Sequence, residues 1–571
     1  MTQIKYCISA PNPLNHQLKI RMEVSDLHKE FVQLIYPDWR PGRYQLTNYV
    51  SNVRCVNTFD EHRNHLKMNK LTRNIWKVDT SACSTLHVEY TYYAFKMDAG
   101  GSVISEHMYY INFINCLFFI KGLENRATEV ELDIPEHLEV ICPLHQLKRN
   151  RFKAPTYYDL VDAPFLAVPE LRKISFQIES TNFSIVIYGG HPLSEKKLTD
   201  AFEGFTKAQI SMFGEFPSAE FTYIIISLPY RFYHGVEHQN STVITLGPNS
   251  ADHKNAYFQD LIGVSSHELV HAWNVTRIRP QELLPFDFSK ENYYDTGFVT
   301  EGFTTYYGDL FLKRGGVITE QMFIDELNKH LKRYFENHGR HEASIVDASF
   351  DLWIDGYGTQ LPRRKPSIYV KGALIALILD LFIRRSSGNR FALDDVFKVL
   401  WTHYGKKSKG YTKSDVFELL QRFGGDGVIS IMDKYIEGTE AIETELSELL
   451  GHVGFELIEC AHPEISASQY GFRIQDNIIK DIAPGSEAET KLSPGDQIVG
   501  INGVGVNDWN WPQFENSAIE IELIRNGVLW QNTIELTPQL HYNIYQIANR
   551  QGSDETTKIN RQLWLGTHMR N

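Results

Sequence analysis

Two histidines four positions apart, with a glutamate directly after the first, form the most reactive pattern in the sequence. They are His267 and His271 in SSHELVHAWNV (265–275), and the glutamate is Glu268. The preceding residues are apolar at helical spacing, which predicts a helix. Residues four apart share one face of a helix, so both imidazoles can reach one metal ion, and Glu268 can address a water held there. Two ordinary buried helix histidines are the alternative.

A catalytic zinc site of this kind needs a third protein ligand and an open position for water. The segment FVTEGFTTYYGDL (298–310) offers Glu301 on a second expected helix, among glycine and aromatic residues. Because a solvated glutamate rarely has such aromatic neighbours, we predict that Glu301 completes a His, His, Glu site for one Zn²⁺. A solvated glutamate at a helix end is the alternative.

The segments HELVHAWNVTRIRP and TEGFTTYYGDL together resemble the glycyl aminopeptidase family, gluzincin zinc metallopeptidases that carry a PDZ domain and are related to the aminopeptidase N family. In that related family the second motif is W-x-x-E-G-F after a shorter gap, whereas Phe298 stands here in place of the tryptophan. YPDWRPGRYQLTNYV (36–50) is similar to the family's N-terminal W-x-P-G-x-Y signature. The resemblance covers nearly the whole chain.

The segment YHGVEHQNST (233–242) resembles the G-x-M-E-N motif of the aminopeptidases. The resemblance implies that Glu237 binds the free α-ammonium group of the substrate and that the backbone beside Gly235 pairs with the bound peptide. Val236 and His238 differ from the Met and Asn of that motif. A carboxylate at a fixed distance from the metal would limit cleavage to one residue.

The segment SIYVKGALIALILDL (367–381) resembles the Y-x-K-G-A motif that carries the catalytic tyrosine of these enzymes. The resemblance implies that Tyr369 donates its phenolic proton to the oxyanion that forms when water adds to the scissile carbonyl. A tyrosine that only packs at the start of a buried helix is the alternative.

The resemblance implies a zinc aminopeptidase that prefers small N-terminal residues such as Gly and Ala and acts on peptides with a free N-terminus. Zinc would activate a water, and Glu268 would accept its proton and pass it to the leaving amine. A zinc endopeptidase and a PDZ-type peptide-binding scaffold with an inactive peptidase domain are the alternatives. Arg277 and Arg279 match the family, and they either pair with carboxylates near the site or support the end of the helix.

The strands and helices that we expect along the chain must position these residues, and their order indicates a multidomain α+β protein. Residues 1–178 read as short alternating strands, which predicts an all-β domain. Residues 179–462 begin with mixed strands and helices and become mostly helical, as in a thermolysin-like catalytic domain. Residues 463–540 predict a small PDZ-like domain with a hairpin at Asn526-Gly527, and residues 541–571 are expected to be a tail.

The PDZ-like segment contains QYGFRI (469–474), which could be a carboxylate-binding loop. In such a loop, backbone N–H groups receive a peptide C-terminus beside an added strand. We therefore expect a peptide C-terminus as a second partner at this domain.

Composition limits the other partners of the 571-residue chain. The net charge is −13 and the basic residues are scattered, which argues against nucleic acid. The most apolar helix candidate, 368–383, contains Lys371 and Asp380 and is too short to span a bilayer, so we expect no membrane partner. The start of the chain does not resemble a secretory signal, and the six cysteines are dispersed. We therefore expect a soluble cytoplasmic protein.

Overall fold

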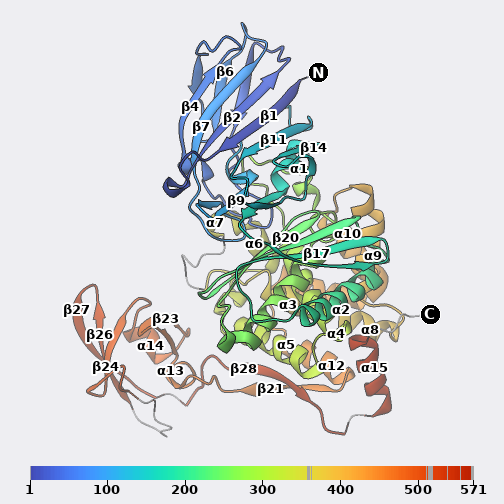
Figure 1. Cartoon of the computed structure of the whole chain (residues 1–571). Coiled ribbons are helices and arrows are strands. Elements are labelled where there is room, and N and C mark those ends of the chain that lie inside the picture. The colour runs from blue at the N-terminus through green and yellow to red at the C-terminus, as the bar shows by residue number, and fades with distance from the viewer. Residues whose placement is uncertain are drawn as a thin grey trace.

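The computed structural model describes residues 2–356, 361, 363–509, 511, 518–536, 538–552 and 554–566. An N-terminal β unit lies above a mixed unit of strands and helices, and a third, smaller β unit stands to one side (Figure 1). The prediction of a multidomain α+β protein is confirmed. One continuous apolar core runs through the first two units, whereas the third unit has a core of its own.

The N-terminal unit is built from three antiparallel or mixed sheets, and its strands bury alternate residues because side chains of a strand point to opposite faces. The largest sheet has, in spatial order, β13 (His145–Lys148), β14 (Arg151–Ala154), β11 (Thr128–Asp133), β1 (Gln3–Ser9), β2 (Gln17–Ser25), β7 (Leu86–Tyr93) and β4 (Val53–Phe59). The second sheet has β10 (Phe119–Ile120), β3 (Phe31–Ile35), β6 (Ile75–Asp79) and β5 (Met68–Lys70). The third has β12 (Glu139–Ile141), β15 (Pro164–Val168), β9 (Met108–Asn112) and β8 (Val103–Ser105), and the short helix α1 (Tyr157–Asp162) precedes β15.

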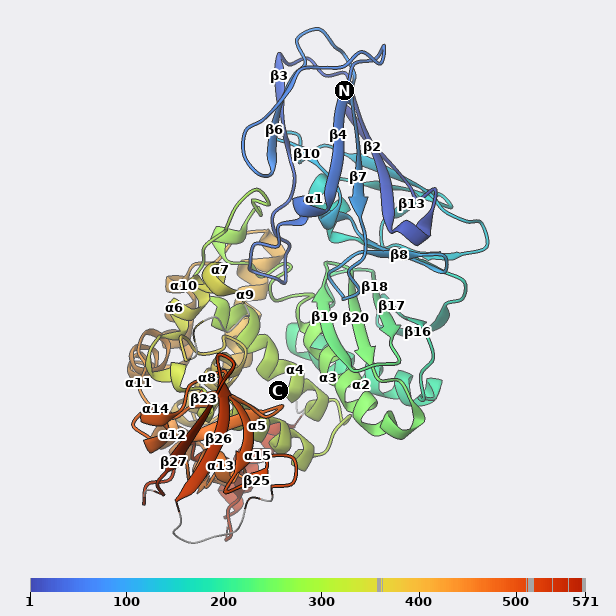
Figure 2. The ribbon, with the colours of Figure 1, turned by 90° about the vertical axis from the view of Figure 1, so that its left-hand side faces the viewer.

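The second unit begins with a five-stranded sheet that lies beneath the N-terminal strands (Figure 2). Its spatial order is β16 (Arg172–Ile178), β17 (Thr181–Tyr188), β18 (Glu220–Ser227), β20 (Ser241–Gly247) and β19 (Phe232–Glu237). Strands β17, β18 and β20 are parallel, and β19 runs antiparallel at the edge. The domain boundary expected between residues 178 and 179 falls in the turn of the β16–β17 hairpin, so β16 shares this sheet although it precedes that boundary.

Helices cover the sheet and form the rest of the second unit. The longer ones are α2 (Glu195–Phe213), α3 (Lys254–Val270), α4 (Thr304–Arg314), α5 (Glu320–Phe335), α8 (Val370–Ser387), α9 (Leu393–His403), α10 (Lys413–Gly424) and α12 (Glu443–His452). The short ones are α6 (Ile345–Phe350), α7 (Leu352–Asp355) and α11 (Gly427–Ile431). Among the residues that the structure describes, no helix combines the length and apolar character needed to cross a bilayer.

The third unit carries the short strands expected of the PDZ-like segment, together with short helices. They are α13 (Ile465–Ser468), β22 (Phe472–Gln475), β23 (Ile478–Ile482), α14 (Glu487–Lys491), β24 (Gln497–Ile501), β25 (Val504–Gly505), β26 (Ile519–Arg525) and β27 (Val528–Ile534). The predicted hairpin is confirmed, because β26 pairs with β27 and the two strands are connected by Asn526 and Gly527, which both have positive φ.

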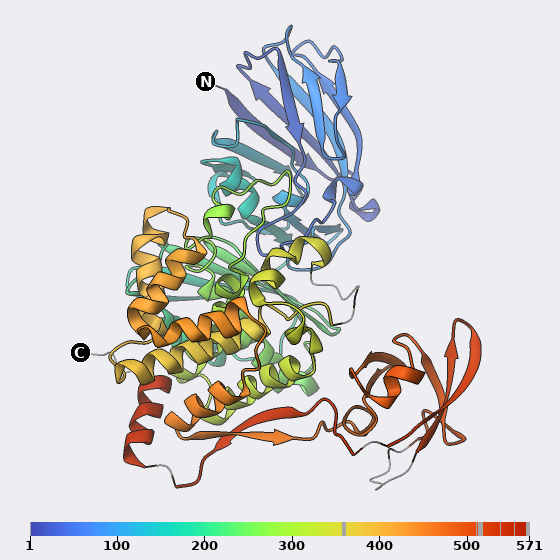
Figure 3. The same ribbon diagram turned by 180° about the vertical axis from the view of Figure 1, so that it is seen from behind.

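The chain returns to the second unit after the PDZ-like segment. Strand β21 (Phe455–Cys460) leads out and pairs with β28 (Ile544–Asn549), which leads back to helix α15 (Glu555–Leu565), as Figure 3 shows from behind. Trp564 of α15 is fully buried, and its Nε1 donates to the Tyr306 hydroxyl at 2.8 Å. Strand β28 and helix α15, which lie within the segment expected as a tail, therefore pack against the catalytic unit.

Candidate active site

His267 and His271 lie at the C-terminal end of α3 and face the same point. Their Nε2 atoms are 3.1 Å apart. His271 donates from Nδ1 to the main-chain carbonyl of Asn274 at 2.8 Å, which leaves Nε2 as its lone-pair nitrogen. The H-E-x-x-H spacing thus presents two imidazole nitrogens to a single position.

Glu301 meets the two histidines from the neighbouring helix. It lies on a π-helical turn, Phe298–Phe303, that runs into α4. Its Oε2 is 3.4 Å from His271 Nε2 and 3.7 Å from His267 Nε2, and its side chain is 2% exposed. Such π-turns insert an extra residue into a helix and often re-aim a side chain at a functional site.

Asn274 connects the turn after α3 to the helix that carries Glu301. Its Nδ2 donates to the Val299 carbonyl at 2.8 Å and to Thr304 Oγ1 at 2.9 Å. Because His271 donates to the Asn274 carbonyl, one residue orients both a histidine and the glutamate turn. Asn274 was not singled out in the sequence, since its role depends on contacts with residues more than twenty positions away.

The group His267, His271 and Glu301 fits a tetrahedral metal ion. Zinc ligands at about 2.0–2.2 Å from the ion are about 3.4 Å from each other in a tetrahedron. The three separations of 3.1, 3.4 and 3.7 Å bracket that value. Two nitrogens and one carboxylate oxygen are also the donor types that zinc accepts, and three protein ligands leave one position open.

The electrostatics of the site favour a bound cation. Burial opposes ionisation of Glu301, yet His271 and His267 lower its pKa to about 2. Burial also opposes the charge on His271, but Glu301, Glu237 and Glu268 raise the pKa of His271 to about 10. The three buried carboxylates therefore stabilise protons on the neighbouring groups. A divalent cation bound at this position would replace those protons.

Glu268 is buried beside the metal-ligand group. Burial raises its pKa well above the usual value, and among the described residues its Oε2 has no hydrogen-bond partner. Gly235 of β19 faces this carboxylate so closely that a Cβ at position 235 would overlap Glu268 Oε1. Glycine at 235 is thus required for the glutamate to lie where it does, which is a reason for that residue independent of substrate binding.

Glu237 lies on the same edge strand and points into the same chamber. Single ligand atoms of Glu237, Glu268 and His271 all lie within 4.8 Å of one another. Burial raises the pKa of Glu237, and its Oε1 has no hydrogen-bond partner within the described part of the chain. Strand β19 is the last strand of its sheet, so its outer edge can pair with an extended peptide.

Tyr369 lies directly before α8 and next to the metal-ligand group. Its ring is 6.3 Å from the His267 ring between centroids, with 28° between the ring planes. Helix α8 reaches this position because Gly302 and Gly372 pack together without side chains, and a Cβ at either position would strike the other backbone. The site residues predicted from separate segments of the sequence therefore lie close to one another around the metal-ligand group.

Arg277 and Arg279 support the loop after α3 through main-chain contacts. Arg277 Nη1 donates to the carbonyls of Gln239 at 2.9 Å and Ala272 at 2.7 Å. The Arg279 guanidinium donates to the Thr276 carbonyl at 2.8 Å and lies 4.0 Å from the centre of an aromatic ring. Of the two roles considered for these arginines, support of the helix end agrees with these contacts.

The N-terminal unit contributes two residues that the search for catalytic motifs missed. Gly42 packs against the carboxylate of Glu237, where a Cβ would overlap it, and Arg40 is buried nearby. Both belong to the W-x-P-G-x-Y segment. The W-x-P-G-x-Y signature was therefore the sequence signal for these two residues. It contains no metal ligand or nucleophile that would have indicated a position in the active site.

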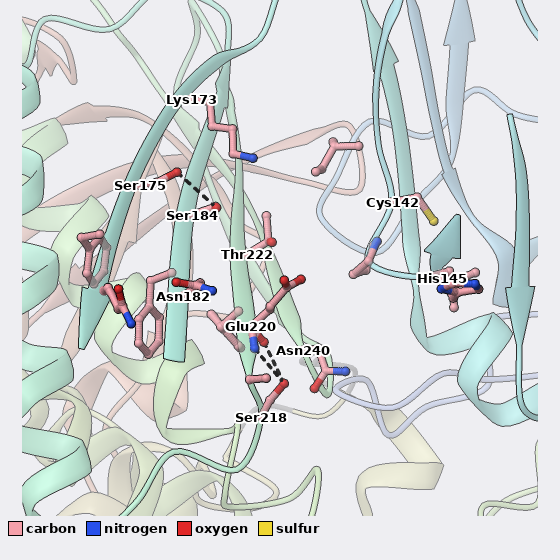
Figure 4. A pocket seen from close by; sticks show the side chains of 18 residues that line it. Cys142, His145, Lys173, Ser175, Asn182, Ser184, Ser218, Glu220, Thr222 and Asn240 are labelled. Atoms are coloured by element: carbon pink, nitrogen blue, oxygen red, sulfur yellow. Dashed lines mark hydrogen bonds between the residues drawn. The ribbon is translucent and has the colours of Figure 1, made fainter. Parts of the chain in front are cut away.

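A second hollow lies elsewhere in the molecule. Figure 4 shows this groove of about 860 Å³, between residues 141–145 and strands β16, β17 and β18. Its polar side chains, including Cys142, His145 and Lys173, are spread over facing elements. The described lining contains neither the histidines nor the glutamates of the candidate site.

The fold and the site together define a peptidase of the H-E-x-x-H class with an N-terminal β domain and a PDZ domain. The family model of the Peptidase M61 N-terminal domain matches residues 5–168, and the model of the M61 glycyl aminopeptidase matches residues 260–375. The model of the PDZ domain matches residues 461–514. The chain belongs to the M61 glycyl aminopeptidase family.

One solved structure agrees with this fold along nearly its full length. An aminopeptidase N family protein from Idiomarina loihiensis is 22% identical, with a TM-score of 0.88 over 99% of this chain and 100% of that chain. An M1 zinc metallopeptidase from Deinococcus radiodurans is 14% identical, with a TM-score of 0.49 over 77% of this chain and 94% of that chain. A search of curated protein sequences finds no match.

Proposed function

We propose that this protein is a zinc aminopeptidase that removes one residue from the free N-terminus of peptides. The observation that carries the proposal is the convergence of His267 Nε2, His271 Nε2 and Glu301 Oε2 at 3.1 to 3.7 Å from one another. Buried carboxylates of Glu268 and Glu237 lie in the same chamber. These three ligands would hold one Zn²⁺, which would supply Lewis-acid polarisation of the scissile carbonyl and lower the pKa of water.

Glu268 acts as the general base and then as the general acid. Its burial raises the pKa of the carboxyl, which suits a group that must accept a proton from water and return it to the leaving amine. Its Oε2, which accepts no hydrogen bond from the described part of the chain, is available for that proton. Tyr369, beside His267, donates its phenolic hydrogen to the oxygen of the scissile carbonyl as negative charge develops there.

Glu237 binds the substrate's α-ammonium group and thereby selects the N-terminus. Its buried Oε1, which has no hydrogen-bond partner among the residues that the structure describes, requires a donor, and an ammonium group supplies both a charge and hydrogen bonds. The substrate backbone adds to the outer edge of β19 at Gly235. We also propose a preference for small N-terminal residues, Gly and Ala, in keeping with the family to which the chain belongs.

The proposal also includes a second peptide-binding site, which lies on the PDZ-like unit. The turn at Gly471, which has positive φ, leads directly into β22, as a loop that receives a peptide carboxylate would. Its ligand is a peptide C-terminus. The unpaired cysteines of the described chain support a reducing compartment, and we propose the cytoplasm.

The test combines metal analysis with substrates that differ only at the N-terminus. The purified full chain should contain about one zinc per molecule. It should hydrolyse glycyl and alanyl arylamides, lose activity with a chelator and regain it with Zn²⁺. N-acetylation of the same substrates should abolish cleavage, because Glu237 would lose its ammonium partner. Cleavage of blocked peptides would indicate an endopeptidase, and absence of both zinc and turnover would indicate a peptide-binding scaffold.

A further inference from the structure

We propose that residues 40–42 of the N-terminal β unit, Arg40, Pro41 and Gly42, form the wall of the amine-binding site and limit the size of the first substrate residue. This inference rests on the aminopeptidase function proposed above. It assigns a specificity-determining role to a loop that carries none of the metal ligands or proton-transfer groups.

The 40–42 segment is held firmly against the catalytic unit. The preceding Asp38 N–H donates to the Phe288 carbonyl at 2.8 Å, and Trp39 Nε1 donates to the Asp287 carbonyl at 2.8 Å. Trp39 is fully buried and packs edge-to-face on Trp353 at 5.2 Å between ring centroids. Because these contacts cross from one unit to the other, the segment is fixed relative to β19 and cannot swing away as a free loop would.

Gly42 closes the space on one side of the amine anchor. Its φ of +73° lies in the left-handed region, and a Cβ at this position would overlap the Glu237 carboxylate. The backbone of the segment is therefore in contact with the group that binds the ammonium. No room is left between them for the atoms of a preceding substrate residue, which explains why cleavage would release a single amino acid.

Arg40 fills the adjoining part of the wall with a buried charge. Its guanidinium lies against Gly100, where a Cβ would overlap it, and Nη1 donates to the Pro41 carbonyl at 2.9 Å. Among the described residues, Nη2 has no hydrogen-bond partner. Arg40 and Glu237 attract each other electrostatically, so the arginine is both a volume that excludes side chains and a counter-charge for the anchor.

A cavity lies directly behind this wall. It has a volume of about 450 Å³ and runs between the N-terminal unit and residues 275–288. Arg40, Pro41 and Glu237 form part of its boundary, together with apolar side chains such as Val236, Phe286 and Phe288. Its described lining includes neither histidine of the metal-ligand group nor Glu301. Space for a large side chain thus exists beside the amine anchor, and Arg40 and Pro41 form part of its boundary.

The experiment compares full-length variants on glycyl, alanyl, leucyl and phenylalanyl arylamides. Arg40→Ala shortens the wall and should raise the ratio of kcat/KM for leucyl over glycyl substrate about tenfold or more. Arg40→Met keeps most of the volume without the charge and should retain the wild-type ratio. Gly42→Ala pushes the Glu237 carboxylate aside and should raise KM for the glycyl substrate about tenfold, with a much smaller change in kcat.

Gly122→Ala is the matched control. Gly122 also has a positive φ in the N-terminal unit, +83°, but a Cβ there would meet only Lys29 Nζ at 3.9 Å. It should therefore carry the same backbone strain as Gly42→Ala and leave KM unchanged. Zinc content and melting temperature report folding for every variant, so a misfolded Arg40→Ala leaves the Gly42→Ala comparison as the deciding measurement.

Two results would overturn the assignment. An active wild-type enzyme whose residue preference is unchanged by a folded Arg40→Ala excludes the wall role of Arg40 while the aminopeptidase function stands. Equal KM values for Gly42→Ala and Gly122→Ala exclude contact between the segment and the amine anchor. A wild-type protein that cleaves none of the arylamides instead refutes the proposed function itself.

Discussion

His271 donates its Nδ1 hydrogen to the main-chain carbonyl of Asn274 at 2.8 Å. This single bond defines the tautomer of the histidine and points Nε2 toward Glu301. The side chain of the same asparagine bonds the turn that carries the glutamate. The geometry of the metal-ligand group therefore depends on a residue that would not itself touch the metal.

Replacement of Asn274 by Ala should weaken zinc binding about 10- to 100-fold, because the Glu301 turn loses its attachment to the end of α3. Competition with a chromophoric chelator measures this affinity. Asn328→Ala is the control, since it removes an amide that instead bonds Ile547. Equal zinc affinities for the two variants would show that Asn274 does not position the ligands.

Replacement of Glu268 by Gln should preserve zinc binding and lower kcat by about 10²- to 10⁴-fold, because the amide cannot accept the proton of the attacking water. Zinc content and turnover of alanyl arylamide should be measured on the same sample. Glu326→Gln, at a half-buried position of α5 outside the metal-ligand group, should behave as wild type. A Glu268→Gln enzyme with near-normal turnover would refute the role of the carboxylate.

Lys371 gives a pH dependence of stability that can be measured apart from activity. The residue is fully buried, its Nζ lies 3.5 Å from the Gly438 carbonyl, and burial lowers its pKa to about 8 against a weaker opposing effect of Asp347. The unfolded chain binds this proton more strongly than the folded chain. Stability should therefore rise with pH between about 8 and 10.5, by on the order of 3 kcal/mol in total.

In Lys371→Met this gain is removed, so the variant should be more stable than wild type at pH 7 and the difference should shrink as pH approaches 10.5. Urea unfolding at several pH values measures it. Lys329→Met, at an exposed position of α5, serves as the control and should follow the wild-type profile. A constant difference between Lys371→Met and wild type across this range would contradict the lowered pKa.

Replacement of Trp564 by Ala should destabilise the catalytic unit by about 3–5 kcal/mol, because a fully buried indole and its hydrogen bond to Tyr306 are lost. Thermal unfolding followed by circular dichroism detects the change. Trp530 on β27 is 47% exposed, and its replacement by Ala should have little effect. Similar melting temperatures for the two variants would mean that α15 does not stabilise the catalytic unit.

The sequence by itself determined the features that depend on local geometry. The spacing of His267, Glu268 and His271 is enough to put two imidazoles on one helix face, because the helical repeat is a property of the backbone. Alternating strands at the N-terminus and the Asn526-Gly527 turn follow from equally local preferences. Glu237 and Tyr369 were reached through motif resemblance, and spacing along the chain does not predict that their segments meet the helix of Glu301 in one chamber.

Only the tertiary structure decided which distant segments share the site and where the chain returns. Gly42 touches Glu237 because the contacts of Asp38 and Trp39 with the catalytic unit fix their loop against β19. Strands β21 and β28 pair across the whole PDZ-like segment, so β28 and α15 of the expected tail pack into the catalytic core. Such contacts are set by burial and pairing between residues far apart in the chain, and no periodicity within either segment encodes its partner.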